Sequence, residues 1–358
     1  MAQNRRGCGC ALVVLFGVLG VALAAYFYFH RETGPKLPPP SGDALSVHVL
    51  DVGQGDSILI IAPGGKTALV DAGNPGNGKK ILAALQRNNV DHIDLFITTH
   101  AHADHIGSAD EVINGTKVST VLDSKVPNTT KNYEDFLKAI EQKGVTYVGA
   151  TPDQTFDLGG GAVITVLAPI QPFFTKDQLR SGGNEPNANS VVTRLDYGDF
   201  SMLLTGDAEA QTEQRMIQKG SRLEADVLKV GHHGSKYATS EDLLRVGKFK
   251  TAVISCGTDN RYGHPSQDAL DRLKAAGVKL FRTDLQGEIT ITTRGKRDDE
   301  QIKGEREASS QEMWAGREPQ KDDSARSGFI QYGDFGPAPK KKDQSSNKSS
   351  NKKTTNGK

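Results

Sequence analysis

The chain has 358 residues, a net charge of +1 and a hydrophobic content of 36%. This length is enough to bury a large core, as one large domain or two small ones. Nothing in the overall charge demands nucleic acid or an acidic membrane as a partner. Of the three cysteines, Cys8 and Cys10 precede an apolar run and Cys256 stands alone in the globular part, which excludes a disulfide inside the domain.

An apolar run of 19 uncharged residues, 11–29, follows Arg5 and Arg6 in the N-terminal segment 1–10. This run is about long enough to cross a bilayer as a helix. A cleaved signal peptide is the alternative, because ALA at 22–24 resembles a small-residue cleavage site. We expect a retained anchor, followed by a Pro-rich linker over residues 30–43.

Alternating and apolar runs between residues 44 and 294 predict strands, and Gly, Asn and Asp turns separate them. The predicted strands cover 46–52, 57–62, 67–73, 94–100, 117–123, 162–168, 190–198, 201–207, 225–231, 251–256 and 288–293. Helical periodicity occupies 78–89, 133–143, 208–219 and 266–276. This order predicts an α+β domain in which packed sheets are covered by helices.

Beyond residue 294 the apolar content falls sharply, and the last 19 residues carry seven lysines. Such a composition buries too little apolar surface to offset the entropy lost on ordering. Residues 295–358 are therefore predicted to be a charged, Lys-rich disordered tail.

The stretch THAHADH, residues 99–105, places three histidines and an aspartate directly after an apolar run. His100 and His102 alternate, so on an extended segment they point the same way. Asp104 and His105 follow where a helix can begin. Two such pairs suit two metal ions a few ångström apart, which is an arrangement for metal-assisted hydrolysis.

Further candidate ligands stand at the ends of other predicted strands. Asp207 ends the run 201–207, His232 and His233 follow the run 225–231, and His264 precedes a predicted helix. Loops at strand ends commonly build sites. We therefore expect these side chains to meet the THAHADH stretch in one metal site.

The sequence HAHADH resembles the HxHxDH signature of the metallo-β-lactamase fold. Over residues 46–293 the chain resembles the metallo-β-lactamase-like domain of ComEC-type competence proteins and its stand-alone relatives. The motifs that carry this resemblance are LDVGQGDSILI, LVDAG, ITTHAHADHIGS, NSVVTRLDYGDFSMLLTGDAE, LKVGHHGS and RYGHPS. This resemblance implies an αββα sandwich of two packed β-sheets flanked by helices. Only one apolar segment is present, so we expect a membrane-anchored form without the competence channel region.

The resemblance also implies a ligand set. Its members would be His100 and His102 on a first ion, Asp104, His105 and His232 on a second, and Asp207 between the two. His232 is preferred to His233 because it follows the strand at once, and His233 would then support it. No histidine lies between 105 and 232, and Asn187 or Asn189 takes the place of a third histidine. An amide oxygen is a harder and weaker donor, so the two divalent ions are expected to be Zn²⁺ or Mn²⁺.

Other candidate residues stand beside the implied site. Asp56 or Asp71 could orient a metal-bound histidine. His264 joins Asp104 as a catalytic candidate, either as an acid for the leaving oxygen or as a phosphate ligand, with a structural role as the alternative. Lys236 could steer an anionic substrate, although an exposed lysine is the ordinary interpretation.

These features predict a metal-dependent hydrolase. The first hypothesis is a phosphodiesterase or nuclease that acts on DNA or RNA outside the membrane through a metal-bound hydroxide. Hydrolysis of a small ester, thioester or β-lactam on the same centre is the second, and a membrane-tethered binding module without catalysis is the third. Nucleic acid and the membrane are the expected partners, and no protein partner is inferred.

Overall fold

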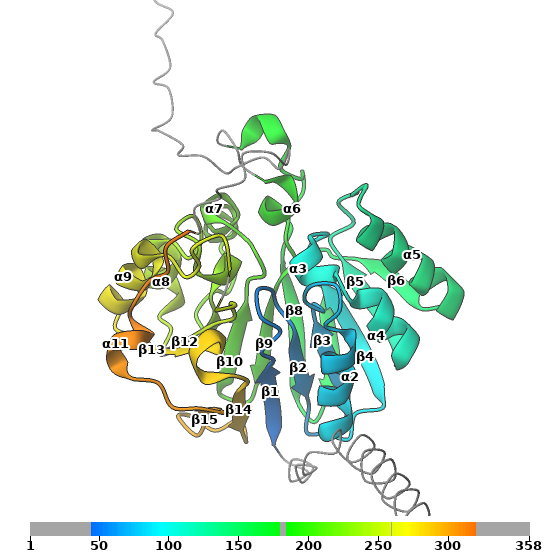
Figure 1. The fold of residues 1–358 in the computed structure, drawn as a ribbon, viewed down its shortest axis with the longest axis horizontal. Helices are drawn as coiled ribbons and strands as arrows, with labels where there is room; N and C mark the ends of the chain where they lie inside the picture. Colours follow the sequence, from blue (N-terminus) through cyan, green and yellow to red (C-terminus); the bar gives the residue numbers. More distant parts are fainter. Residues whose placement is uncertain (1–43, 180–183, 259, 320–358) are drawn as a thin grey trace, which may run out of the picture.

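The computed structural model describes residues 44–179, 184–258 and 260–319 (Figure 1). The predicted anchor at 11–29 and residues 320–358 of the predicted tail lie outside this range. None of the helices within the described residues has the length and apolar character needed to span a bilayer.

Two sheets form the centre of the domain. The eight-stranded sheet has the order β15-β14-β1-β2-β3-β4-β5-β6 and the seven-stranded sheet the order β13-β12-β11-β10-β9-β8-β7. The first consists of β1 (Leu45–Val49), β2 (Ile58–Ile61), β3 (Thr67–Val70), β4 (His92–Thr98), β5 (Lys117–Asp123), β6 (Thr146–Gly149), β14 (Ile289–Thr293) and β15 (Gln301–Gly304). The second consists of β7 (Thr155–Gly159), β8 (Ala162–Ala168), β9 (Val192–Tyr197), β10 (Phe200–Leu204), β11 (Val227–Lys229), β12 (Thr251–Ile254) and β13 (Lys279–Arg282).

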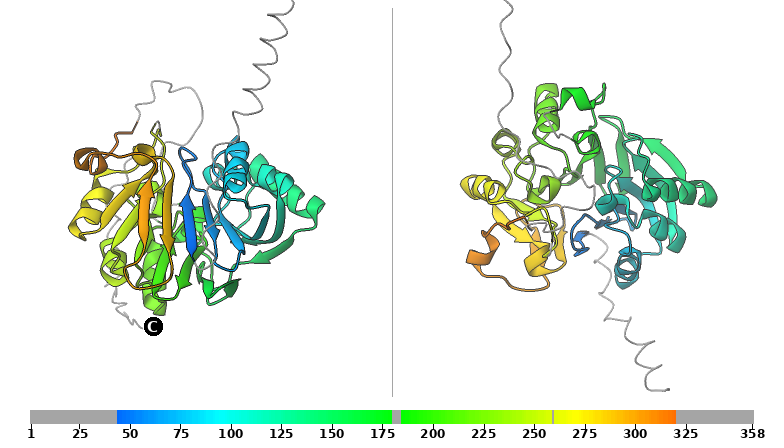
Figure 2. Two further views of the ribbon diagram at one scale, coloured as in Figure 1. Left: turned by 90° about the horizontal axis from the view of Figure 1, so that it is seen from below. Right: turned by 45° about the horizontal axis from the view of Figure 1, so that its top comes forward.

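Helices cover the outer face of each sheet. They are α2 (Gly78–Arg87), α3 (Ala103–Ile106), α4 (Ala109–Gly115), α5 (Lys131–Lys143), α6 (Glu185–Ala188), α7 (Ala210–Lys219), α8 (Glu241–Gly247), α9 (Gln267–Ala275), α10 (Thr283–Gln286) and α11 (Ser310–Met313), with 3₁₀ turns η1 (Lys176–Gln178) and η2 (Gly231–Gly234). Helices α2, α4 and α5 lie on one side of the molecule and α7, α8 and α9 on the other (Figures 1 and 2). The predicted αββα sandwich is thus confirmed.

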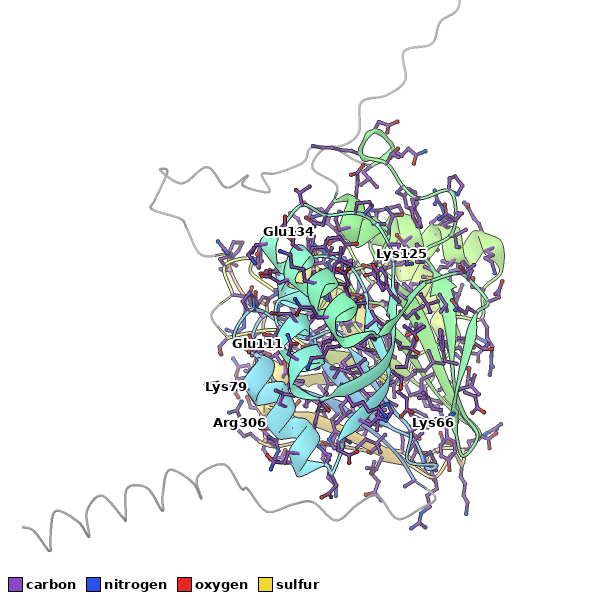
Figure 3. All side chains as sticks on the ribbon, turned by 90° about the vertical axis from the view of Figure 1, so that its right-hand side faces the viewer. Lys66, Lys79, Glu111, Lys125, Glu134 and Arg306 are labelled. Carbon is purple, nitrogen blue, oxygen red and sulfur yellow. The ribbon has the colours of Figure 1, made fainter. Side chains whose placement is uncertain are left out.

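The burial pattern explains this layering. In β2 every side chain is buried, and successive residues point to opposite faces. Ile58 and Ile60 pack between the two sheets, whereas Leu59 and Ile61 pack under the helices. A third apolar cluster lies between the second sheet and its helices. The outermost layer is polar, and charged side chains such as Lys79 and Glu134 stand on the helix-covered face (Figure 3).

Each sheet combines antiparallel and parallel strands. Strands β3 to β6 run parallel in the first sheet, and β10 to β13 run parallel in the second. The carboxyl ends of neighbouring parallel strands meet at one edge, where loops build ligand sites in α/β sheets. THAHADH follows β4, Asp207 follows β10, and the histidine pair follows β11.

The predicted domain boundary at residue 294 is wrong, because ordered elements continue beyond it. Strand β15 extends the first sheet by pairing with β14. Met313 is buried at 7% exposure in the cluster under the second sheet. The guanidinium of Arg282 donates to the carbonyls of 312, 313 and 315. The disordered tail predicted from composition therefore does not begin at 295.

Candidate metal centre

Contacts within the protein itself fix the conformation of the loop after β4. The amide of Thr99 donates to Asp71 Oδ1 at 2.8 Å. Helix α3 begins directly after His102 and turns Asp104 and His105 inward. Gly55 approaches so closely that a Cβ there would lie 2.3 Å from the carbonyl oxygen of Asp104, and its φ of +132° also requires glycine.

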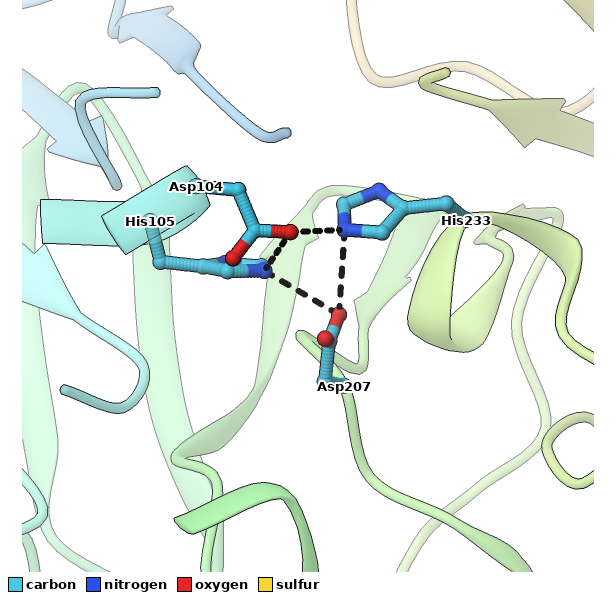
Figure 4. A group of neighbouring side chains, drawn as sticks. All are labelled: Asp104, His105, Asp207 and His233. Atoms are coloured by element: carbon cyan, nitrogen blue, oxygen red, sulfur yellow. Dashed lines mark ion pairs between the residues drawn. The ribbon is translucent and has the colours of Figure 1, made fainter. Parts of the chain in front are cut away.

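One group of side chains brings together Asp104, His105, Asp207 and His233, whose ligand atoms all lie within 4.8 Å of one another (Figure 4). Nε2 of His105 is 3.2 Å from Oδ1 of Asp207. Nε2 of His233 is 3.3 Å from Oδ2 of Asp104 and 3.5 Å from the same Oδ1 of Asp207. Two imidazoles and two carboxylates therefore converge on one point.

A second group joins His100, His102 and the same Asp207. Nε2 of His100 is 2.9 Å from Nδ1 of His102 and 3.6 Å from Oδ2 of Asp207. Asp207 thus presents one carboxylate oxygen to each group. A carboxylate placed in this way could contact two cations, which is the role that the family resemblance implies for Asp207.

The donor atoms fit divalent ions. Nε2 of His105, Nε2 of His233 and Oδ1 of Asp207 are buried and make no hydrogen bond with any part of the chain that the structure describes. Buried polar atoms that make no hydrogen bond are costly, and several of them facing one point form a set of donors suited to a metal ion. Imidazole nitrogen and carboxylate oxygen are donors that suit Zn²⁺ and Mn²⁺.

The charged side chains of the cluster shift one another's pKa. Burial alone lowers the pKa of a histidine, but the carboxylates of Asp207 and Asp71 raise the pKa of His105 well above its usual range. Against the same effect of burial, Asp207 and Asp56 raise the pKa of His233 to about 10. Burial raises the pKa of Asp207, yet the surrounding histidines lower it well below its usual range. Bound cations would take the place of these imidazole protons.

The choice of His232 as the ligand beside Asp104 and His105 is corrected by the structure, which places His233 there. Strand β11 ends at Lys229, so neither histidine continues it. Both adopt left-handed backbone angles, with φ of 48° and 54°, inside the turn η2. His233 is fully buried as a result, whereas the His232 side chain is 21% exposed, with its Nε2 3.6 Å from Oδ2 of Asp207.

The two asparagines offered as substitutes for a third histidine have different surroundings. The side chain of Asn189 is occupied, because it accepts from the amide of Phe174 and donates to two backbone carbonyls. Asn187 is buried at 2% exposure, and its Oδ1 has no hydrogen-bond partner in the described chain. Its Nδ2 lies 3.4 Å from the ring nitrogens of His232. Asn187 is therefore the candidate that remains.

Groups behind the ligands fix their orientation. Nδ1 of His105 donates to Oδ2 of Asp71 at 2.7 Å, as predicted for one of the two aspartates. Nδ1 of His233 donates instead to the carbonyl of Ser255 at 2.9 Å, and Asp56 Oδ1 is more distant at 3.5 Å. Both rings thereby direct Nε2 into the cluster.

Asp56 has a different partner, which sequence reasoning missed. Its Oδ2 is 2.8 Å from Nζ of Lys229, a fully buried lysine. The ion pair outweighs the effect of burial, so the pKa of Asp56 falls to about 2. A lysine inside the otherwise apolar stretch 227–230 was the available signal, because a lysine in a buried strand requires an anionic partner.

The remaining predicted residues lie outside both ligand groups. The ring of His264 is 5.3 Å from that of His232, and its Nδ1 is buried without a hydrogen-bond partner among the described residues. Lys236 is exposed, and its ammonium lies 5.2 Å from the Tyr237 ring. The structure therefore brings His264 to the edge of the centre but does not bring Lys236 into a ligand group.

The fold of two packed β-sheets and the two neighbouring ligand groups are those of a metal-dependent hydrolase. The chain belongs to the Metallo-beta-lactamase superfamily, whose family model matches residues 50–258.

Similarity to individual curated proteins narrows the assignment within this superfamily. ComE operon protein 3 of Bacillus subtilis is 32% identical over 260 residues, covering 68% of this chain and 32% of that protein. Recombination protein 2 of Haemophilus influenzae is 31% identical over 250 residues, covering 68% of this chain and 28% of that protein. Competence protein ComA of Neisseria gonorrhoeae is 27% identical over 299 residues, covering 79% and 37%. The chain spans about a third of the length of these relatives, and they confirm the predicted likeness to ComEC-type proteins.

Proposed function

We propose that this hydrolase is a metal-dependent phosphodiesterase that cleaves nucleic acid. The observation that carries the proposal is the position of Asp207, with one oxygen toward each ligand group. Two divalent ions, when bound, lower the pKa of water and neutralise the charge that develops on the entering and leaving oxygens. Asp104, His105 and His233 would hold one ion, and His100 and His102 the other.

Residues of the chain itself supply contacts to the substrate. His264 stands at the edge of the ligand groups, with its ring 5.3 Å from that of His232, and is the candidate to meet a phosphate oxygen there. Exposed cationic side chains stand on the loops that follow β5, β11 and β12, namely Lys125, Lys236 and Arg261. The loop after β5 reaches the ligand loop, since the side chain of Asn128 donates to the carbonyl of Ala101 at 3.0 Å. Cationic side chains on these loops favour a polyanionic substrate over a neutral one.

The names of the relatives also favour nucleic acid as the substrate. Two of them are named for competence and recombination, which are processes in which DNA is handled.

We further propose that residues 11–29 remain as a single membrane anchor, so that the domain acts outside the membrane. Fractionation of cells that express the tagged chain, with and without residues 1–29, tests this placement. Recovery of the full chain in the soluble fraction contradicts it.

The proposed activity is tested with the full chain in mild detergent, stripped of metal and supplied with Mn²⁺ or Zn²⁺. The substrates are single- and double-stranded DNA, bis(p-nitrophenyl) phosphate and a β-lactam. His102→Ala removes a candidate ligand and should abolish cleavage. His92→Ala is the matched control, because His92 bonds Ser119 at the amino end of β4, away from the centre.

DNA cleavage that is lost in His102→Ala and retained in His92→Ala supports the proposal. Turnover of the β-lactam alone would assign the centre to small amides and contradict it. Metal binding without turnover of any of these substrates would favour a binding module, which also contradicts the proposal.

A further inference from the structure

An exposed aromatic side chain stands on the loop that follows β12. Tyr262 is 45% exposed, and within the described ranges it is the one large hydrophobic side chain at the surface. An aromatic side chain that keeps nearly half of its area exposed offers a flat apolar surface on which a ligand ring can pack.

Rings connect Tyr262 to the metal centre. The Tyr262 ring stacks on that of His264, with centroids 5.7 Å apart and planes inclined by 25°. His264 in turn meets His232 at 5.3 Å, and Nε2 of His232 is 3.6 Å from Oδ2 of Asp207. Two ring contacts therefore link the exposed ring to His232, which lies beside the carboxylate that faces both ligand groups.

A cation accompanies the ring. The guanidinium of Arg261 is 5.6 Å from the centroid of the Tyr262 ring, and its side chain is exposed. Surfaces that bind single-stranded nucleic acid combine aromatic platforms for the bases with cations for the backbone. Tyr262 and Arg261 place both components next to each other at the edge of the centre.

We propose that Tyr262 stacks on an unpaired base beside the scissile phosphate and so selects single-stranded nucleic acid. A base inside a duplex already has neighbours on both faces and cannot offer one to Tyr262 without being unstacked. This inference rests on the proposed phosphodiesterase function and names the form of its substrate. Tyr262 acts on substrate choice, and the chemistry remains with the metal centre.

The test compares Tyr262→Leu, which removes the ring, with Tyr262→Phe, which keeps it. The full chain with Mn²⁺ is given a labelled oligothymidylate, the same strand with abasic sites, and a duplex. Stacking contributes about 5- to 150-fold in affinity per base, so the Leu variant should raise KM for oligothymidylate by a factor in that range. KM for the abasic strand should stay the same, and the Phe variant should resemble the wild type. Tyr197→Leu, at the opposite end of the second sheet, is the control.

A second readout does not depend on turnover. In the His102→Ala background, a strand containing 2-aminopurine should lose fluorescence when it stacks on Tyr262. Addition of Tyr262→Leu should abolish this quenching, and addition of Tyr262→Phe should retain it.

Failure of the inference and failure of the proposed function give different results. Cleavage of single strands with an unchanged KM in Tyr262→Leu, or equal cleavage of duplex and single strands, overturns the inference and leaves the phosphodiesterase standing. Absence of binding and cleavage of every nucleic acid by the wild type overturns both.

Discussion

Replacement of Asp284 by asparagine tests whether the segment beyond residue 294 is part of the folded domain. Asp284 pairs with Arg282, whose side chain is 1% exposed, and Oδ2 of Asp284 lies 2.8 Å from its guanidinium. Nε of Arg317 donates to the same Oδ2, also at 2.8 Å. One carboxylate therefore neutralises a buried cation and holds the C-terminal segment.

The expected cost follows from the burial of the pair. Removal of one partner from a buried ion pair costs about 3–5 kcal/mol, because the other charge is left without compensation. The contact with Arg317, a side chain 25% exposed, adds less than about 1 kcal/mol. Arg282 keeps its three carbonyl partners. We therefore expect Asp284→Asn to lower the free energy of unfolding by about 3–4 kcal/mol, a large share of the usual 5–15 kcal/mol.

The chain supplies its own probe, because its single tryptophan is Trp314 in the same segment. Urea unfolding of the full chain is followed by Trp314 fluorescence and by far-UV circular dichroism. If the segment belongs to the domain, both transitions should move together to lower urea. Arg317→Ala is the control and should shift them by less than about 1 kcal/mol. The reasoning fails if Asp284→Asn costs no more than Arg317→Ala, or if only the fluorescence transition moves.

The remaining predictions concern the metal centre, acid and the C-terminal segment. His233→Ala should reduce the metal retained after dialysis more than His232→Ala, as measured by elemental analysis; equal retention would contradict the placement of His233. Chelation should lower the melting temperature, since ions at 100 times their Kd stabilise by about 2.7 kcal/mol; an unchanged melting curve argues against buried ions. Burial raises the pKa of Asp284, but Arg282 and the other guanidinium lower it below the usual 3.8. The contribution of Asp284 to the free energy of unfolding is therefore complete above about pH 4 and is lost as the pH falls through the lowered pKa. The difference in stability between wild type and Asp284→Asn, measured by urea unfolding, should accordingly shrink in acid. A difference that stays constant with pH would mean that the charge of this carboxylate does not stabilise the fold. Met313→Ala should cost about 2 kcal/mol in the same assay, and no loss would mean that the side chain is not buried.

Sequence patterns predict the centre of this fold better than its margins. The four predicted helices correspond to α2, α5, α7 and α9, and the eleven predicted strands are present, because their apolar faces are buried. Strands β6, β7, β13 and β15 were missed, and these four are the edge strands of the two sheets. The residues of β6, β7 and β15 are mostly half-buried or exposed, so these strands lack the apolar alternation that reveals a central strand. Strand β13 has only four residues, three of them buried, which is too short a run to show a pattern. The segment that holds Met313 was missed for a related reason, since a few buried residues in a charged context barely change the composition.

The site was predictable where ligands follow a local pattern. His100, His102, Asp104 and His105 stand within a few residues of one another, and the structure brings all four to the centre. The choice between two adjacent histidines was not predictable, because it depends on left-handed angles in a turn rather than on strand alternation. The buried Lys229 was missed because its partner Asp56 is distant in sequence.

The position of β1 has a consequence for how the chain is made. Its five residues pair with β2 on one side and on the other with β14, which begins only at Ile289. The first strand emerges from the ribosome long before its partner exists. Pairings between such distant segments form late and slowly. The first sheet of this domain is complete only after β14 and β15 have been made, so a chain exported during its synthesis would cross the membrane open and fold on the far side.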